Sequence, residues 1–177
     1  MKYLLDIPYP QMNHIEPHIE YGQMILSNLG GIDSEMSAVS LYFYNHIITK
    51  DTWKELSEAM QQISFIEMKH LDILAELCYR LGIDPRLWAC HDDSLQYWSP
   101  GYNIYPRQIH TILENAIEDE RTAIALYQSQ IDYIQDENIQ MILNRIILDE
   151  QFHLEIFENF LQQYQQQKDN YYLKQFE

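Results

Sequence analysis

The sequence predicts an all-α fold, a four-helix bundle with a long crossover between its second and third helices. Three observations favour this fold. Apolar residues recur at helical spacing along four long stretches. The 177 residues include only 5 Gly and 6 Pro, which leaves room for long helices. Two halves of the chain also share one pattern of Glu, His and Tyr. A chain of this length suits one well-buried domain and is short for two.

The first 29 residues are predicted to form an N-terminal arm. Pro8 and Pro10 interrupt its beginning, and a short amphipathic segment then runs from Pro17 toward Leu29. The glycine pair that follows suits a helix stop. We expect this arm to pack on the bundle or on a second subunit. The bundle itself is assigned to residues 30–168, and residues 169–177 form a C-terminal tail.

Four longer stretches have the periodicity of amphipathic helices. They are predicted at residues 34–48, 52–81, 106–133 and 138–165. Short turns join the first helix to the second and the third to the fourth, so each pair is expected to be antiparallel. Residues 83–104 separate the pairs and are predicted to be irregular. About 22 residues at roughly 3.3 Å each can follow a whole helix of about 45 Å, which permits parallel second and third helices.

Two Glu-x-x-His motifs are the main chemical feature of the chain. A Glu and a His three residues apart lie on one face of a helix, about one turn from each other. Each motif follows another inward Glu by 32 or 30 residues, and each of these begins a Glu-x6-Tyr pattern. In chain order the residues are Glu35, Tyr42, Glu67 and His70, then Glu120, Tyr127, Glu150 and His153. The matched spacing indicates two copies of one helical hairpin.

The four Glu and two His residues are expected to meet at one depth in the bundle. In both halves they lie about 15 residues from the hairpin turn, or roughly 22 Å along the helix. Buried carboxylates repel one another unless they are protonated or neutralised. No Lys or Arg occurs in the predicted inward stripes, so we expect divalent metal rather than a purely structural network. Zinc prefers one tetrahedral set and calcium rarely accepts imidazole, whereas Glu-rich ligation with one His per ion suits Fe or Mn.

Composition excludes several other functions. The formal charge of −16 argues against nucleic acid or an anionic membrane surface as a partner. No apolar run resembles an export signal or a membrane span, so a cytoplasmic protein is expected. Cys78 and Cys90 form no Cys-x-x-Cys motif, which argues against a rubredoxin-type iron site or a disulfide framework.

The ligand pattern resembles that of the ferritin-like di-iron and di-manganese carboxylate proteins, within their rubrerythrin and manganese catalase branch. Residues 30–42 with Glu67-x-x-His70 are similar to manganese catalases. The later sequence around Glu120, with Asp149-Glu150-x-x-His153, is similar to rubrerythrins and bacterioferritin-type proteins. The resemblance covers residues 30–165 and implies a ferritin-like bundle.

The resemblance also implies a role for each ligand. Glu35 and His70 would be terminal ligands of one metal, and Glu67 would bridge the two metals. Glu120 would be the second bridge, and His153 would bind the second metal. These roles imply two ions per chain, either Fe or Mn.

Two further residues are given roles by the same resemblance. Glu150 would be a terminal ligand or a group that transfers protons, and Asp149 would orient a ligand histidine through its free ring nitrogen. The helical spacing places Tyr42 and Tyr127 about two turns beyond Glu35 and Glu120 on the same face. These tyrosines would hydrogen-bond to the ligands, quench radicals, or simply pack in the core with their hydroxyls satisfied. The chain has Ile117 where rubrerythrins carry an extra Glu.

The expected function is a di-metal oxidoreductase that acts on hydrogen peroxide or dioxygen. Manganese would favour catalase chemistry, and iron would favour peroxidase or oxidase chemistry with an external electron donor. One alternative is a ferroxidase or iron-storage protein, and a second is a structural or coat-associated bundle. A homodimer or higher homo-oligomer is expected.

Overall fold

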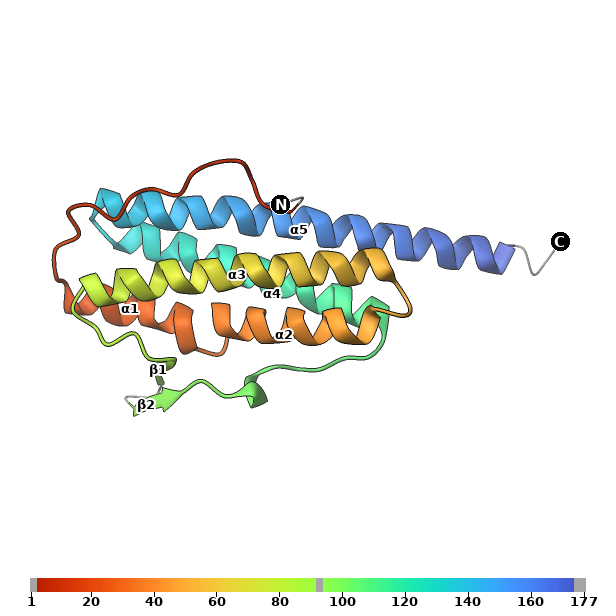
Figure 1. Ribbon diagram of the computed structural model, residues 1–177, viewed down its shortest axis with the longest axis horizontal. Helices are drawn as coiled ribbons and strands as arrows, with labels where there is room; N and C mark the ends of the chain where they lie inside the picture. The colour runs from red at the N-terminus through yellow and green to blue at the C-terminus, as the bar shows by residue number, and fades with distance from the viewer. Residues whose placement is uncertain (1–2, 92–93, 174–177) are drawn as a thin grey trace.

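The computed structural model describes residues 3–91 and 94–173 of the chain (Figure 1). Its α-helices are α1 (Ile19–Gly30), α2 (Glu35–Thr49), α3 (Lys54–Arg80), α4 (Ile109–Tyr133) and α5 (Glu137–Leu173). The four predicted bundle helices correspond to α2 to α5. The fourth extends beyond its expected end at residue 165, and residues 174–177 of the predicted tail lie outside the described residues.

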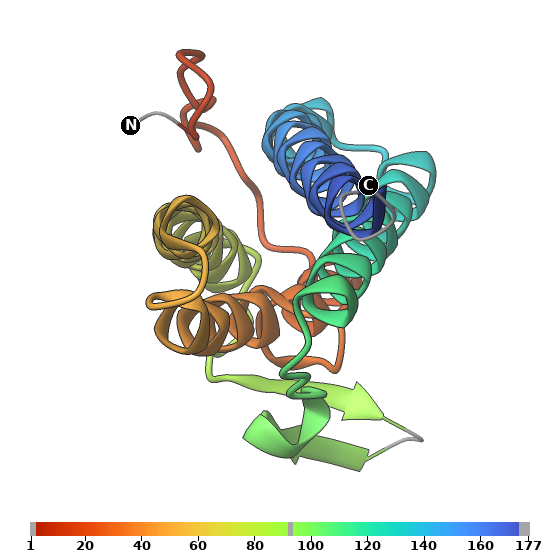
Figure 2. The ribbon, with the colours of Figure 1, turned by 90° about the vertical axis from the view of Figure 1, so that its right-hand side faces the viewer.

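The helices form two antiparallel hairpins, α2–α3 and α4–α5, and α3 runs parallel to α4 (Figure 1). The predicted all-α bundle with a crossover is therefore confirmed. Seen from its end, the bundle has the N-terminal arm on the side of α3 and α5, and the crossover on the opposite side, next to α2 and α4 (Figure 2). No helix in the described ranges is apolar over a length that could cross a bilayer.

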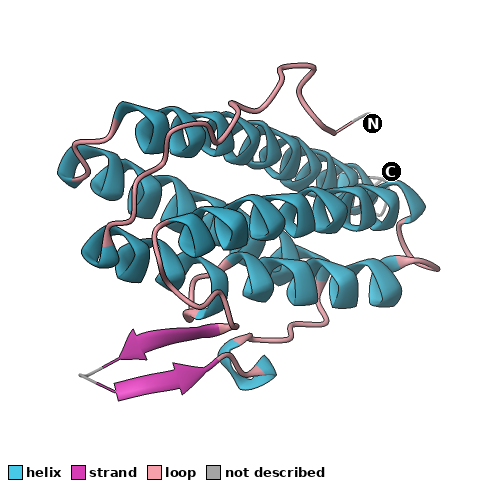
Figure 3. Cartoon of the chain, turned by 60° about the vertical axis from the view of Figure 1, so that its left-hand side comes forward, coloured by secondary structure: helices cyan, strands magenta, loops and turns pink. Residues whose placement is uncertain are grey.

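The crossover is more regular than predicted (Figure 3). It contains an antiparallel hairpin, β1 (Trp88–His91) with β2 (Ser94–Tyr97), followed by the 3-10 helix η1 (Pro100–Tyr102). Trp88 pairs with Tyr97 across the strands, with ring centroids 5.6 Å apart. Cross-strand aromatic pairs of this kind stabilise short hairpins. Because the segment contains two paired strands, the expectation of an irregular segment was wrong.

The crossover is fastened to α2 by polar side chains. The indole N–H of Trp98 donates to Ser37 Oγ at 3.0 Å, and Asn103 Nδ2 donates to Ser40 Oγ at 2.7 Å. These bonds hold the crossover against the outer side of α2 next to the beginning of that helix.

Helix α1 contributes to the core of the bundle. Its buried apolar side chains pack with residues of α3 and α5; they are Ile25, Leu26 and Leu29. Asn28 and Gln130 of α4 exchange two hydrogen bonds of 2.8 Å, both between buried groups. A Cβ atom on Gly30 would lie 2.4 Å from the backbone nitrogen of Trp88, so a glycine is required where α1 meets β1. The division of the chain at residue 29 stays a prediction, but α1 packs inside the bundle.

The apolar core consists of two clusters. Along α3, the first cluster contains residues up to Ile66 and the second begins at Leu74. Along α5 the order is reversed: residues up to Ile147 belong to the second cluster, and residues from Ile156 onward belong to the first. A layer of ionisable side chains lies between the two clusters, near the middle of the helices.

Candidate metal centre

The six predicted ligands all lie in this layer, and none is more than 4% exposed. Each bundle helix supplies one part of the set: Glu35 from α2, Glu67 and His70 from α3, Glu120 from α4, and Glu150 and His153 from α5. The helical periodicity places each Glu-x-x-His pair on the inward face of its helix. Residues from both halves of the chain therefore meet in one buried site.

The ligands form two overlapping groups that could each hold a metal ion. Within each group, one ligand atom from every residue lies within 4.8 Å of the others. The first group is Glu35, Glu67, His70 and Glu150, and the second is Glu67, Glu120, Glu150 and His153. Glu67 and Glu150 thus belong to both groups.

The carboxylates of these two shared residues lie between the histidines. His70 Nδ1 is 2.9 Å from Glu67 Oε2 and 3.1 Å from Glu150 Oε1. His153 Nδ1 is 2.9 Å from Glu67 Oε1 and 3.2 Å from Glu150 Oε2. Each shared carboxylate therefore presents one oxygen to each histidine, which is the arrangement expected of a carboxylate between two cations.

The arrangement of these carboxylates differs from the expectation that Glu120 provides the second bridge. Glu120 belongs to one group only, and Glu150 takes the position between the two groups. The repeat in the sequence contained the relevant signal, because Glu150 corresponds to Glu67 and Glu120 corresponds to Glu35. Residues in equivalent positions of two similar hairpins are expected to occupy equivalent places around the centre.

Tyr42 and Tyr127 connect the two hairpins. The hydroxyl of Tyr42, on α2, donates to Glu120 Oε1 of α4 at 2.6 Å. The hydroxyl of Tyr127, on α4, donates to Glu35 Oε1 of α2. Burial raises the pKa of both hydroxyls, which keeps them protonated as donors. Each tyrosine therefore orients the outer glutamate of the other hairpin.

The buried ligands favour proton uptake when they are free of metal. Burial, together with the negative charge of Glu150, raises the pKa of Glu35 to about 8 and that of Glu120 well above its ordinary value. Burial favours the neutral form of His153, but the charges of Glu67 and Glu150 outweigh it and raise the pKa to about 9. Protons can therefore balance part of the charge of the four carboxylates.

The donor set fits a pair of divalent cations. Two such ions carry the charge that balances four carboxylates, with both histidines neutral. Carboxylate oxygen and imidazole nitrogen together suit Fe or Mn. Both Nδ1 atoms point toward the shared carboxylates, so the Nε2 atoms point outward, where other residues of the chain can reach them.

A hydrogen-bonded group lies behind His70. Its Nε2 atom is 3.2 Å from Asp149 Oδ2 and 3.0 Å from the hydroxyl of Tyr9, which itself donates to Asp149. Arg145 Nη1 lies 2.8 Å from Asp149 Oδ1. Asp149 was expected near a ligand histidine, whereas Tyr9 and Arg145 were missed. Arg145 has a sequence signal, since it lies one helical turn before Asp149, but the position of Tyr9 on the arm has none.

Arg145 lies outside the predicted inward stripes, which contain no Lys or Arg, but it is buried in the structure. It is only 4% exposed. Its guanidinium pairs with Asp149 and donates to the backbone oxygen of Ile7, at 2.9 Å from Nη2. This charge therefore compensates Asp149. Within residues 3–91 and 94–173, no Lys or Arg forms an ion pair with the four predicted ligand carboxylates.

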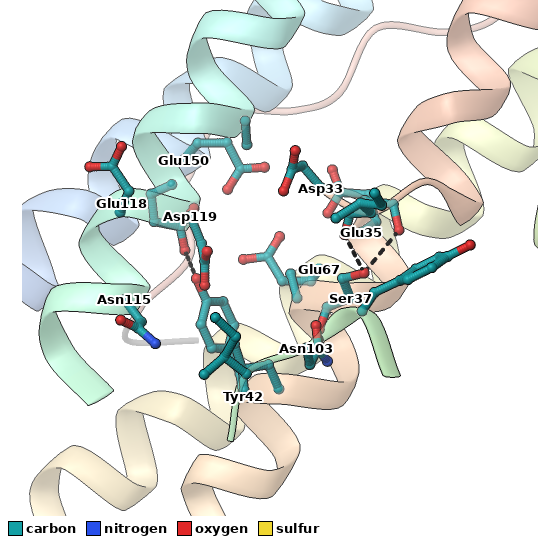
Figure 4. Close-up of a pocket in the computed structure, with 18 of the residues that line it drawn as sticks. Asp33, Glu35, Ser37, Tyr42, Glu67, Asn103, Asn115, Glu118, Asp119 and Glu150 are labelled. Atoms are coloured by element: carbon teal, nitrogen blue, oxygen red, sulfur yellow. Dashed lines mark hydrogen bonds between the residues drawn. The ribbon is translucent and has the colours of Figure 1, made fainter. Parts of the chain in front are cut away.

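A cavity of about 370 Å³ leads to the carboxylates from the side of α2 and α4. Figure 4 shows Glu67 and Glu150 facing it, with Tyr42 in its wall. Asp33 and Asp119 also line it, and burial and the charge of Asp33 raise the pKa of Asp119 to about 6. Neither ligand histidine lines the cavity. A small molecule therefore reaches the carboxylates first, while the histidines lie at the back.

Comparison with solved structures supports the fold. The chain is similar to a manganese catalase from Anabaena, with 20% identity, a TM-score of 0.78, and coverage of 91% of this chain and 80% of that chain. It is also similar to the bacterioferritin of Rhodobacter capsulatus, with 21% identity, a TM-score of 0.72, and coverage of 86% and 89%. A bacterioferritin of Desulfovibrio desulfuricans gives 23% identity, a TM-score of 0.71 and 88% coverage of both chains.

No curated protein matches the sequence. The rubrerythrin family model, in contrast, matches residues 29–161, which span all four bundle helices except the last part of α5 and include all six ligands. The chain therefore belongs to the rubrerythrin family, within the ferritin-like proteins.

Proposed function

We propose that the protein is a di-metal oxidoreductase that acts on hydrogen peroxide or dioxygen. The observation that carries this proposal is the sharing of Glu67 and Glu150 between the two histidines, with one oxygen of each carboxylate toward each ring. Such a centre would hold two ions close together, which suits two-electron chemistry on an O–O bond. Bound Fe or Mn ions would supply the redox equivalents and the Lewis acidity.

The residues of the chain would bind, orient and exchange protons. Glu67 and Glu150 would hold both ions, and Glu35 and Glu120 would each hold one. The cavity between α2 and α4 would admit a small substrate to the carboxylate side of the centre. Glu150 lines this cavity, so its carboxylate is also placed to accept a proton from the substrate and return it. The tyrosine hydroxyls would keep the outer glutamates in place.

The ligand set leaves two chemistries for this function. With manganese, the centre would dismutate hydrogen peroxide and need no external reductant. With iron, it would reduce peroxide or dioxygen and need an external electron donor. Similar structures include a manganese catalase and a bacterioferritin described with a diiron site, in agreement with either metal.

A second candidate function is oxidation of Fe(II), with or without iron storage. The observation that favours it is the acidic opening of the cavity, where Asp33, Glu118 and Asp119 lie together. Negative charge at the opening would attract a cation and would not favour neutral peroxide. Storage would further require a closed shell of many subunits, whereas an oxidoreductase needs only a small homo-oligomer.

Metal analysis and three assays test these functions together. The protein is purified without added metal, and its Mn and Fe are measured per chain alongside oxygen release from hydrogen peroxide, Fe(II) oxidation and mass in solution. Two Mn ions with oxygen release support a catalase. Two Fe ions without oxygen release support peroxidase or oxidase chemistry, and rapid Fe(II) oxidation by a large shell supports storage. Failure to bind Fe(II) or Mn(II) after reconstitution would contradict both functions and leave a structural bundle.

A further inference from the structure

The two ligand histidines differ in what lies behind them. His70 Nε2 lies within hydrogen-bond distance of Asp149 and Tyr9, at 3.2 and 3.0 Å. His153 Nε2 is buried and has no hydrogen-bond partner among the described residues. Both rings are completely buried, and both direct Nδ1 toward the same shared carboxylates. The difference is therefore confined to the outer side of each ring.

The sequence repeat explains this difference. Residues 67 and 70 correspond to residues 150 and 153, each 83 positions later. The same shift pairs Asp149 with Ile66, which is 1% exposed and belongs to the apolar cluster that contains Ile156 and Phe157 of α5. One hairpin thus supplies a carboxylate to the histidine of the other, and the second hairpin has an apolar residue in the equivalent position.

The N-terminal arm adds to the polar contacts behind His70. The guanidinium of Arg145 lies 4.3 Å from the ring centroid of Tyr9, and Lys69 Nζ lies at the same distance. Arg145 also donates to the backbone oxygen of Ile7. These contacts attach the arm to α5 and α3 and hold the Tyr9 hydroxyl against Asp149 and His70. The arm is therefore part of the support of one histidine.

The outer contact of a histidine affects how well it binds a metal. To bind through Nδ1, the ring must be neutral and carry its proton on Nε2. A carboxylate that accepts this N–H fixes the tautomer and the ring orientation and increases the basicity of Nδ1; its loss typically costs about 10- to 100-fold in metal affinity. His70 has this acceptor in Asp149. His153 would keep a buried N–H for which the described part of the chain offers no acceptor, and this would weaken its binding of a metal.

We propose that the two metal positions are inequivalent, and that the position of Glu35 and His70 binds a divalent ion about 10- to 100-fold more tightly than the position of Glu120 and His153. Asp149 and Tyr9 are positioning residues for the tight position. The position at His153 is the one from which an ion exchanges with solution. This inference rests on the proposed metal centre and adds an order of filling to it.

A titration of the metal-free full-length protein with Mn(II) in the absence of oxygen tests the proposal. Free Mn(II) is followed by electron paramagnetic resonance, and heat is measured in parallel. Two separate steps of one ion each, with dissociation constants that differ by about 10-fold or more, are expected. Two ions of equal affinity, or of cooperative binding, would overturn the inequivalence alone. No binding at all would overturn the metal centre and this inference together.

Substitutions behind His70 test which residues cause the difference in affinity between the two metal positions. Asp149→Asn removes the charge but keeps an acceptor, and Tyr9→Phe removes only a hydroxyl. Both are expected to weaken the first binding step, by about 10-fold for Asp149→Asn and less for Tyr9→Phe, and to leave the second step unchanged. An equal effect on both steps would indicate a general loss of structure and would contradict the assignment.

A gain of binding is the sharper test. Ile66→Asn places an acceptor at the position equivalent to Asp149, and it is expected to strengthen the second step by several-fold while the first step stays the same. Ile66→Val, which keeps the site apolar, is the matched control and should change neither step. Circular dichroism of the metal-free variants verifies that each is folded. A folded Ile66→Asn protein with an unchanged second step would overturn the role assigned to the outer acceptor.

Discussion

The two hairpins of the bundle supply the same candidate metal ligands in different surroundings. Hairpin α2–α3 and hairpin α4–α5 each provide one outer Glu, one shared Glu and one His. Only α5 carries a carboxylate, Asp149, directly before its shared Glu, with a buried arginine, Arg145, four residues before Asp149. The comparison shows that the candidate ligands recur in both hairpins, whereas the carboxylate that contacts His70 from behind occurs in one hairpin only.

The hairpins are also mutually dependent. Tyr42 of the first holds the outer glutamate of the second, and Tyr127 of the second holds the outer glutamate of the first. Asp149 of the second hairpin reaches His70 of the first. Changes in one hairpin are therefore expected to act on ligands of the other, which the following substitutions examine.

The largest effect is expected from the shared carboxylates. Glu67→Gln and Glu150→Gln keep the side-chain volume but remove a charge that would serve both ions. Each variant should lose both metals and its activity, because neither position keeps its full ligand set. Metal content after gel filtration measures this. Retention of two ions by either variant would contradict the shared role of that residue.

A smaller effect is expected from the outer carboxylates. Glu35→Gln and Glu120→Gln each remove a ligand from one position only, so each variant should lose about one ion and keep the other. Metal content per chain again provides the measurement. The pair also tests whether Glu120 serves one ion or two, because loss of both ions from Glu120→Gln would indicate that Glu120 is a bridge.

Stability of the metal-free protein should depend on pH. The pKa of Glu35 is raised by burial from 4.5 to about 8, and that of His153 is raised by its carboxylate neighbours, against burial, from 6.5 to about 9. A group whose pKa is raised in the folded protein binds its proton more tightly there than in the unfolded chain. This adds to the free energy of unfolding below the ordinary pKa, and the contribution is lost as the pH rises through the raised pKa. The Tm should therefore fall between pH 6.5 and 9, by on the order of 5 °C.

Thermal melts followed by circular dichroism in a chelator measure this fall. The same melts with saturating Mn(II) provide the control, because the bound ions replace the protons and the Tm should then not fall over this range. A Tm of the metal-free protein that rises from pH 6.5 to 9 would show that the ligands do not hold these protons.

The smallest effect is expected from the tyrosines. Tyr42→Phe and Tyr127→Phe remove one hydroxyl each and leave the rings in place. Loss of one hydrogen bond to a carboxylate corresponds to roughly 1.5–3 kcal/mol at most, and relaxation of the glutamate reduces this. Both variants should bind two ions and show activity lowered by about 10-fold or less. Steady-state kinetics and metal content test this, and loss of an ion would assign the tyrosines a larger role.

Regular features of the molecule were predictable from its sequence. The four helices follow from apolar residues at helical spacing, and the ligands follow from the three-residue interval between each shared Glu and its His. The bridging roles are less predictable: the resemblance implies Glu120 as the second bridge, whereas the arrangement of the side chains favours Glu150, which belongs to both groups.

Long-range contacts were not predictable. Tyr9 and Asp149 lie 140 residues apart in sequence, and no periodicity connects an irregular arm to a helix. The burial of Arg145 depends on the backbone oxygen of Ile7, which only the folded arm places nearby. The β1–β2 hairpin was missed because its strands have only four residues each, too few to establish an alternating pattern.

Anomalous X-ray diffraction from crystals of the protein grown with saturating Mn(II) tests the central claim most directly. The account predicts two peaks of anomalous density per chain, one beside Glu35 and His70 and the other beside Glu120 and His153. Glu67 and Glu150 should each place one oxygen on either peak. A single peak, or no peak within this buried layer, would contradict a di-metal centre built from these six residues.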